Sequence, residues 1–151
     1  QNVGKVDLFG WEVSAAYRQG PWELFGNGSR TYAPSSEGVV RVAGGRFNYG
    51  VAFDLAGPAN SDVRFEALGR TVLSSRDETF IGSGNTASDI TNYPSFSTFE
   101  IRGRMDIPLQ NDRKLRLVAG VRNLTDKQYR EPFFDQIQPE RSIYGSAQWM
   151  F

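Results

Sequence analysis

Apolar and polar residues alternate along most of this chain with a period of two, which is typical of a β-strand with one apolar face. The clearest segment places five apolar residues on one side of the backbone: Phe47, Tyr49, Val51, Phe53 and Leu55. The same period recurs at residues 11–18, 22–32, 63–73, 99–107, 114–123 and 143–151. The pattern therefore predicts seven strands and an all-β fold.

Two of these segments depart from simple alternation. In residues 22–32, Gly26, Gly28 and Arg30 stand on the face that should be apolar. In residues 99–107, four charged residues follow one another on the polar face: Glu100, Arg102, Arg104 and Asp106. Because a charged group needs water or a counter-charge nearby, this row should meet a wet space or another charged surface.

The connections between the predicted strands alternate in length. Short turns follow the first, third and fifth strands, at residues 19–21, 56–62 and 110–114, and long polar loops follow the others, at about 33–45, 74–94 and 125–142. Short turns at one end and long loops at the other are typical of an outer-membrane β-barrel. A soluble sandwich has no reason to sort its loops in this way.

Two interpretations of the alternation remain open: a soluble β-sandwich binding module, whose apolar face is the core, and a transmembrane barrel, whose apolar face meets lipid. Small residues on the apolar faces, among them Ala67, Gly69, Gly103 and Ala119, fill a core poorly and favour the barrel. Aromatic residues near the strand ends also favour it, because they resemble interfacial girdles: Tyr17, Trp22, Tyr32, Tyr93, Phe96 and Trp149.

Composition narrows the function classes. Of 151 residues, 39% are hydrophobic, and no stretch approaches the roughly 18 apolar residues of a membrane helix. Seventeen basic and seventeen acidic residues cancel, so no net charge attracts nucleic acid. The chain has no Cys and no His, which removes thiolate sites and the usual general base. Glu100 and Asp106 would lie about 20 Å apart on a strand, which is too far for an acid–base pair, so we expect no catalysis. We also expect no metal site and no cofactor.

Four segments carry a resemblance to a known family. They are "NVGKVDLFGWEVSAAYR" at residues 2–18, "GPWELFGNGSRTYA" at 20–33, "LRLVAGVRNLTDKQYREP" at 115–132 and "RSIYGSAQWMF" at 141–151. In this order they resemble the C-terminal part of a TonB-dependent outer-membrane receptor, and the resemblance covers essentially all of residues 1–151. It departs from the family at the sixth position from the end, where Ser146 replaces the usual Gly.

The resemblance implies an antiparallel, up-and-down transmembrane β-barrel segment, about seven strands of a barrel of about 22. The plug domain and the N-terminal strands would lie outside this chain. The implied function is energy-coupled uptake of a scarce nutrient, with a ferric siderophore as the favoured ligand, in the bacterial outer membrane. The implied partners are outer-membrane lipid, the plug and remaining strands of the same receptor, the TonB energy complex and the barrel-assembly machinery. A passive porin-like channel is the alternative within membranes.

Three groups of residues are candidates for a functional role under this interpretation. Trp149 and Phe151 would form the terminal signal that the assembly machinery reads. The last long loop would offer ligand contacts: Tyr129, Arg130, Phe133, Phe134 and Asp135. The lumen side would carry the charged set that either lines a substrate path or, as we favour, bonds to the plug or within itself: Glu12, Arg18, Arg64, Glu66, Arg70, Glu100, Arg102, Arg104, Asp106, Arg116 and Arg122.

Two further expectations concern the faces of the strands. Arginine at Val51 or Ile101 should be costly if that face meets lipid, whereas arginine at Gly50 or Ala52 should be tolerated in a wet lumen. The plug is expected to balance the row of charges in residues 100–106.

Overall fold

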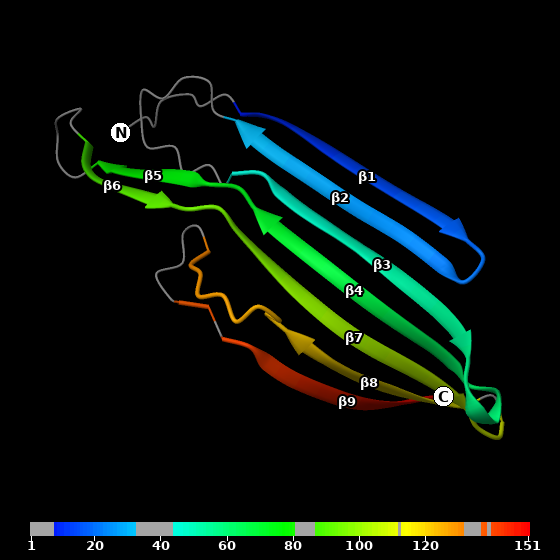
Figure 1. The fold of residues 1–151 in the computed structure, drawn as a ribbon. Coiled ribbons are helices and arrows are strands. Elements are labelled where there is room, and N and C mark those ends of the chain that lie inside the picture. The colour runs from blue at the N-terminus through cyan, green and yellow to red at the C-terminus, as the bar shows by residue number, and fades with distance from the viewer. Residues whose placement is uncertain (1–7, 33–43, 81–86, 112, 132–136, 139) are drawn as a thin grey trace.

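Seven long strands form one antiparallel sheet, shown face-on in Figure 1. The computed structural model describes residues 8–32, 44–80, 87–111, 113–131, 137–138 and 140–151. The sheet strands are β1 (Phe9–Gln19), β2 (Trp22–Tyr32), β3 (Arg46–Ala56), β4 (Asp62–Val72), β7 (Phe96–Pro108), β8 (Lys114–Arg122) and β9 (Ser142–Met150). Their spatial order is β1-β2-β3-β4-β7-β8-β9, and every neighbouring pair is antiparallel.

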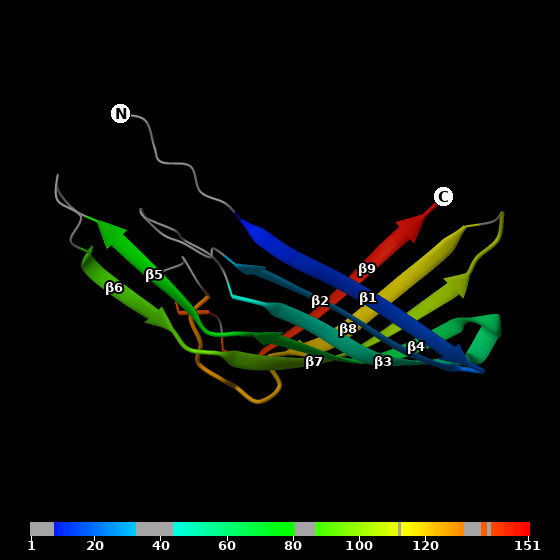
Figure 2. The ribbon, with the colours of Figure 1, turned by 90° about the horizontal axis from the view of Figure 1, so that it is seen from above.

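This arrangement confirms the predicted all-β, antiparallel, up-and-down sheet of seven strands, and the sheet is not closed. One expectation was wrong. The connection at residues 74–94 is not simply a loop, because it contains a second, two-stranded sheet of β5 (Ser75–Phe80) and β6 (Ala87–Tyr93). Figure 2 shows this hairpin extending beyond the large sheet.

The short connections lie together at the end of the sheet opposite this hairpin (Figure 1). β1 and β2 are joined by Gly20 and Pro21, and Gly20 adopts a left-handed φ of 56°, which glycine allows at no steric cost. The 3-10 helix η1 (Pro58–Asn60) joins β3 to β4. At the third turn, Leu109 N donates to Arg113 O at 2.8 Å. We call this the turn end, and the other the loop end.

The register keeps apolar side chains on one face of the whole sheet. Val51 lies opposite Leu24 and Ala67, and Ala67 lies opposite Ile101. Alternate residues of each strand, which we call one parity, therefore point to the same face from strand to strand. The large apolar side chains of the sheet that are exposed all lie on this apolar face: Phe9, Trp11, Val13, Tyr17, Trp22, Leu24, Tyr32, Tyr49, Leu55, Phe65, Phe99, Ile101, Leu117, Ile143 and Trp149. No described helix or strand packs against them (Figure 2).

Some aromatic residues predicted to form a girdle are instead buried. Tyr93 is 6% exposed and Phe96 is 4% exposed, beside Val72 at 3%. Phe96 has the parity of the polar face, and its ring stacks on Tyr129 with the centroids 4.3 Å apart. The girdle prediction was therefore wrong for Tyr93 and Phe96, because the loop after β8 covers this corner of the sheet.

The polar face also holds a few apolar side chains. Their packing contradicts the expectation that arginine at Gly50 or Ala52 would be tolerated. Ala52 is only 1% exposed. A Cβ on Gly50 would come within 2.7 Å of the Phe25 ring and 2.9 Å of Leu68. Arginine at Gly50 or Ala52 would thus meet packed atoms rather than open water.

Two smaller points concern the ends of elements. β9 stops at Met150, one residue before the predicted end, and Phe151 is 94% exposed. Among the residues that the structure describes, no helix has the length and hydropathy to cross a membrane.

Candidate functional site

Arg64 is the centre of an ion-pair network on the polar face near the turn end. Its guanidinium lies 2.8 Å from Glu23 on β2, 3.1 Å from Asp54 on β3 and 3.0 Å from Glu66 on β4. The Arg64 side chain is 16% exposed, and Glu66 also pairs with Arg102 on β7. One arginine thus ties three adjacent strands, and Glu66 extends the network to a fourth.

A second group of ion pairs lies farther along the same face. Asp106 accepts two hydrogen bonds from Arg116 at 2.7 and 2.9 Å and lies 3.6 Å from Arg104. The Arg64 network also includes Arg18, which pairs with Asp54 at 2.6 Å. The charged row of β7 therefore finds counter-charges on the sheet itself. Antiparallel register brings carboxylates beside the arginines, so these charges are paired within the set, as one of the two expected arrangements has it. A contact with a plug stays a prediction.

A third contact joins β9 to β7 across β8. The Tyr144 hydroxyl donates to Glu100 at 2.6 Å, and Arg122 lies over the Tyr144 ring, 4.4 Å from its centroid. Arg122 Nε is also 3.6 Å from Glu100. Gly120 leaves room for the crossing, because a Cβ there would lie 2.6 Å from the Tyr144 hydroxyl.

The chain turns back over the polar face directly after β8. Asn123 and Asp126 adopt left-handed φ angles of 49° and 54°, which Asn and Asp tolerate better than most residues. The Asn123 side chain donates to Lys127 O at 2.9 Å and accepts from Lys127 N at 3.0 Å. We call residues 123–131 the strap.

The strap is anchored to the sheet at two points. Glu131 accepts two hydrogen bonds from Arg70 of β4 at 2.7 and 2.9 Å and lies 3.8 Å from Arg46. Tyr129 stacks on Phe96. The Arg70 hydrogen bonds hold the pKa of the Glu131 carboxyl below its usual value, and burial raises the pKa of the Tyr129 hydroxyl. Glu131 is therefore ionised at neutral pH and Tyr129 is not.

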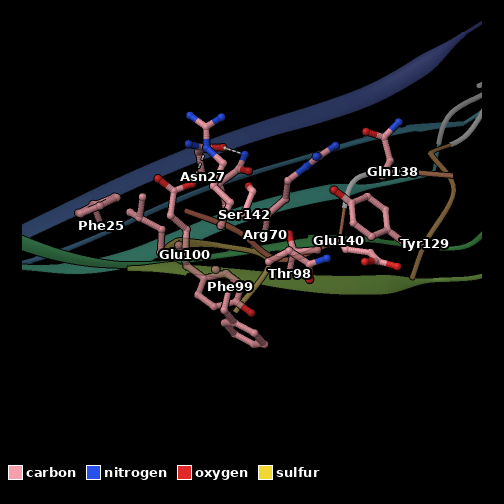
Figure 3. A pocket seen from close by; sticks show the side chains of 16 residues that line it. Phe25, Asn27, Arg70, Thr98, Phe99, Glu100, Tyr129, Gln138, Glu140 and Ser142 are labelled. Atoms are coloured by element: carbon pink, nitrogen blue, oxygen red, sulfur yellow. Dashed lines mark hydrogen bonds and ion pairs between the residues drawn. The ribbon is translucent and has the colours of Figure 1, made fainter. Parts of the chain in front are cut away.

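Between the strap and strands β2, β3, β4 and β7 lies an open hollow of about 450 Å³ (Figure 3). Uncharged polar residues contribute much of its wall, and Asn48 Nδ2 donates to Asn27 Oδ1 at 2.9 Å. Figure 3 shows Asn27, Arg70 and Ser142 on one side of the sheet, with Phe99 pointing away on the other. The hollow brings polar side chains of several strands and of the strap together at the loop end.

The predicted residues divide into groups. All eleven candidates for the lumen side lie on the polar face. Of the last-loop candidates, Tyr129 contacts Phe96 and the hollow, Arg130 is exposed, and Phe133, Phe134 and Asp135 lie outside the described residues. Of the terminal pair, Trp149 is 50% exposed, and its ring lies 6.5 Å from that of Phe151.

Sequence reasoning missed several polar residues that the structure uses: Glu23, Asn27, Asn48, Asp54, Glu131 and Tyr144. Most have the correct parity for the polar face, so alternation alone could have included them. Glu131 had no such signal, because it belongs to a loop.

The described residues contain no group of three or more acidic side chains placed to hold a metal ion. Comparison of the chain with protein-family models, with curated proteins and with solved structures finds no match in any of the three.

Proposed function

We propose that this chain is the C-terminal barrel segment of an outer-membrane receptor for energy-coupled uptake of a scarce nutrient, such as a ferric siderophore. Its apolar face would meet lipid and its polar face would line the lumen. The remaining strands and the plug would come from the same receptor, and the TonB complex would supply energy through the plug. The apolar face carries the proposal: one side of the sheet exposes fifteen large apolar side chains.

A soluble protein rarely leaves a contiguous apolar surface of this extent uncovered. A sandwich would need a second sheet against this face, and no described element lies there. Lipid is the solvent in which such a face is stable, provided that every backbone group is paired by neighbouring strands. The sheet pairing of β2, β3, β4, β7 and β8 on both sides meets that requirement.

The positions of aromatic residues support a membrane of ordinary thickness. Trp22 and Tyr32 lie on the same face near opposite ends of β2, which corresponds to about 33 Å of strand. With the usual tilt of about 40°, this spans about 25 Å, the height of the apolar band in such barrels. Tyr32 accepts a hydrogen bond from Trp11 at 3.2 Å, and Arg30 lies 4.7 Å from the centroid of its ring. The one charged residue on this face of β2 thus lies at the level of a girdle.

The test compares adjacent positions of one strand. Ala147 on the apolar face and Ser146 on the polar face are both small and exposed. In the full-length receptor folded into liposomes, Ala147→Arg should cost about 2 to 4 kcal/mol of unfolding free energy, as should Ile101→Arg. Ser146→Arg should cost less than about 1 kcal/mol. Equal costs at Ala147 and Ser146 would exclude a lipid-facing sheet.

A second measurement distinguishes active uptake from a passive channel. Cells that express the full-length receptor should lose uptake of a ferric chelate when a protonophore collapses the energy supply. Uptake that continues at the same rate would favour the porin-like alternative. Both outcomes leave the lipid-facing assignment intact, because that assignment rests on the arginine substitutions.

A further inference from the structure

The hollow at the loop end is lined by a balanced set of charges. Arg70 and Arg122 contribute positive charge, and Glu100 and Glu140 contribute negative charge. Arg70 is held by Glu131, which also lies 3.8 Å from the Arg46 guanidinium at the rim. Arg122 is paired with Glu100 at 3.6 Å. Within the described wall, each of these guanidinium groups already has a carboxylate partner.

An anionic ligand would therefore meet an unfavourable surface here. To contact Arg70 or Arg122 it must compete with a carboxylate that is already in place, and it must approach Glu100 and Glu140. Like charges that are brought together repel each other, even where water screens part of the interaction.

The same wall suits an uncharged ligand. Asn48 Nδ2 donates to Asn27 Oδ1, which leaves the Asn27 amide hydrogens and the Asn48 carbonyl oxygen for another partner. A donor and an acceptor then lie side by side on neighbouring strands. Thr98, Gln138 and Ser142 add further uncharged polar groups to the lining.

We propose that this hollow selects an uncharged ligand rich in hydrogen-bonding groups and disfavours anionic ferric chelates. The proposal rests on the proposed receptor function and specifies its ligand class. A neutral ferric hydroxamate complex and a short oligosaccharide share this chemistry, and the experiment distinguishes them.

The experiment measures binding by calorimetry to the full-length receptor in detergent. The probes are ferrichrome, a neutral ferric trihydroxamate, maltotriose, a neutral oligosaccharide, and ferric enterobactin, an anionic tricatecholate. We expect one neutral probe to bind at least tenfold more tightly than the tricatecholate. Asn48→Ala should weaken that neutral probe about fivefold, as expected for the loss of one hydrogen bond.

Charge substitutions provide the complementary test. Glu140→Gln should strengthen binding of the tricatecholate about fivefold, because it removes one repulsive charge. Asp62→Asn is the matched control. Asp62 lies on the same face, is exposed, and stands at the turn end, about 26 Å along β4 from Arg70. It should change the affinity for no probe.

The proposal is overturned if the tricatecholate binds more tightly than both neutral probes. It is also overturned if neither neutral probe binds. Binding in detergent requires neither lipid nor energy. Failure here is therefore distinct from failure of the proposed function, which the arginine substitutions and the protonophore test separately.

Discussion

Glu131 determines where the chain after β8 lies, because it accepts both hydrogen bonds from Arg70 while Tyr129 covers Phe96. Each contact joins a residue of the strap to the inner part of the sheet. The stacked rings bury apolar area, and the charge-assisted pair orients the strap. At the scale of single residues, then, a loop that sequence reasoning treated as a possible ligand contact is also a structural part of the polar face.

The Arg70–Glu131 pair predicts that acid releases the strap. Because the folded pKa of Glu131 lies below its unfolded value, the contact stabilises the strap fully above the unfolded value of about 4.3. That stabilisation is lost as the pH falls through the folded pKa, when the carboxyl takes up a proton. A spin label at the exposed position Arg130 in the full-length receptor should gain mobility between pH 7 and pH 3.

Glu131→Gln should make the label mobile already at pH 7 and remove the pH dependence. A label at Asn111, in a turn at the other end of the sheet, is the control and should not respond. If the label at position 130 has the same mobility across this range in the unsubstituted receptor, the pair does not hold the strap.

At the scale of elements, glycine and aromatic residues face one another across neighbouring strands. Gly28 lies opposite Phe47, Gly50 opposite Phe25, Gly69 opposite Tyr49 and Gly120 opposite Tyr144. In each pair the ring occupies the space that a Cβ would need. Such pairs favour one register, because a shift by one residue would remove the space for the ring.

This pairing predicts different costs for two glycines on the neighbouring strands β8 and β9. A Cβ on Gly120 would lie 2.6 Å from the Tyr144 hydroxyl and 2.8 Å from the Ile101 carbonyl oxygen. Gly120→Ala should therefore cost about 1 to 3 kcal/mol of unfolding free energy. On Gly145 the nearest atom would be Val118 O at 3.6 Å, so Gly145→Ala should change stability by less than about 0.5 kcal/mol.

Urea unfolding of the full-length receptor in liposomes provides the measurement for both variants. Tyr144→Ala in the Gly120→Ala background separates the two clashes, because it removes the hydroxyl and the ring carbon Cζ, which a Cβ would meet at 2.7 Å, and leaves the carbonyl. If Gly120→Ala costs no more unfolding free energy than Gly145→Ala, Tyr144 does not pack closely against Gly120.

At the scale of the whole molecule, the sheet has two unpaired edges. β1 and β9 are its first and last strands and, because the count of antiparallel strands is odd, they run in the same direction. They cannot pair with each other in an antiparallel way. Closing the sheet as an antiparallel barrel requires an odd number of additional strands. In the proposed function these strands come from the remainder of the full-length receptor.

We therefore expect the isolated 151 residues not to form a functional unit. Open strand edges are costly in hydrocarbon, where no water can satisfy their backbone groups. In detergent the chain should form a mixture of oligomers, as measured by light scattering after gel filtration, and should transport no probe in liposomes. A uniform monomeric barrel with specific uptake would contradict both the open edges and the fragment interpretation.

The C-terminal end predicts an effect on assembly. Trp149 lies on the apolar face, Phe151 follows the end of the strand, and Arg113 lies 5.8 Å from the centroid of the Phe151 ring. Replacing both aromatic residues with Ser should lower the amount of heat-modifiable receptor at the cell surface. Gln148→Ser, on the opposite face of β9, is the control. Unchanged surface levels of the double variant would mean that the end is ordinary lipid-facing sequence.

The sequence by itself determined the seven strands of the large sheet, their faces, and the alternation of short and long connections between them. Alternation is a local property of extended backbone, so parity can be read without knowledge of any partner. This is why the seven strands and the common face of the eleven charged candidates agree with the structure.

Only the tertiary structure decided which groups meet. Register determines that Arg64 reaches Glu23 from two strands away, and that Tyr144 passes over Gly120 to Glu100. The burial of Phe96 is likewise not predicted by its local sequence, because it depends on Tyr129, which belongs to the strap after β8. These contacts depend on long-range pairing, which no local period encodes, and they convert a row of charges on β7 into a network balanced within the sheet itself.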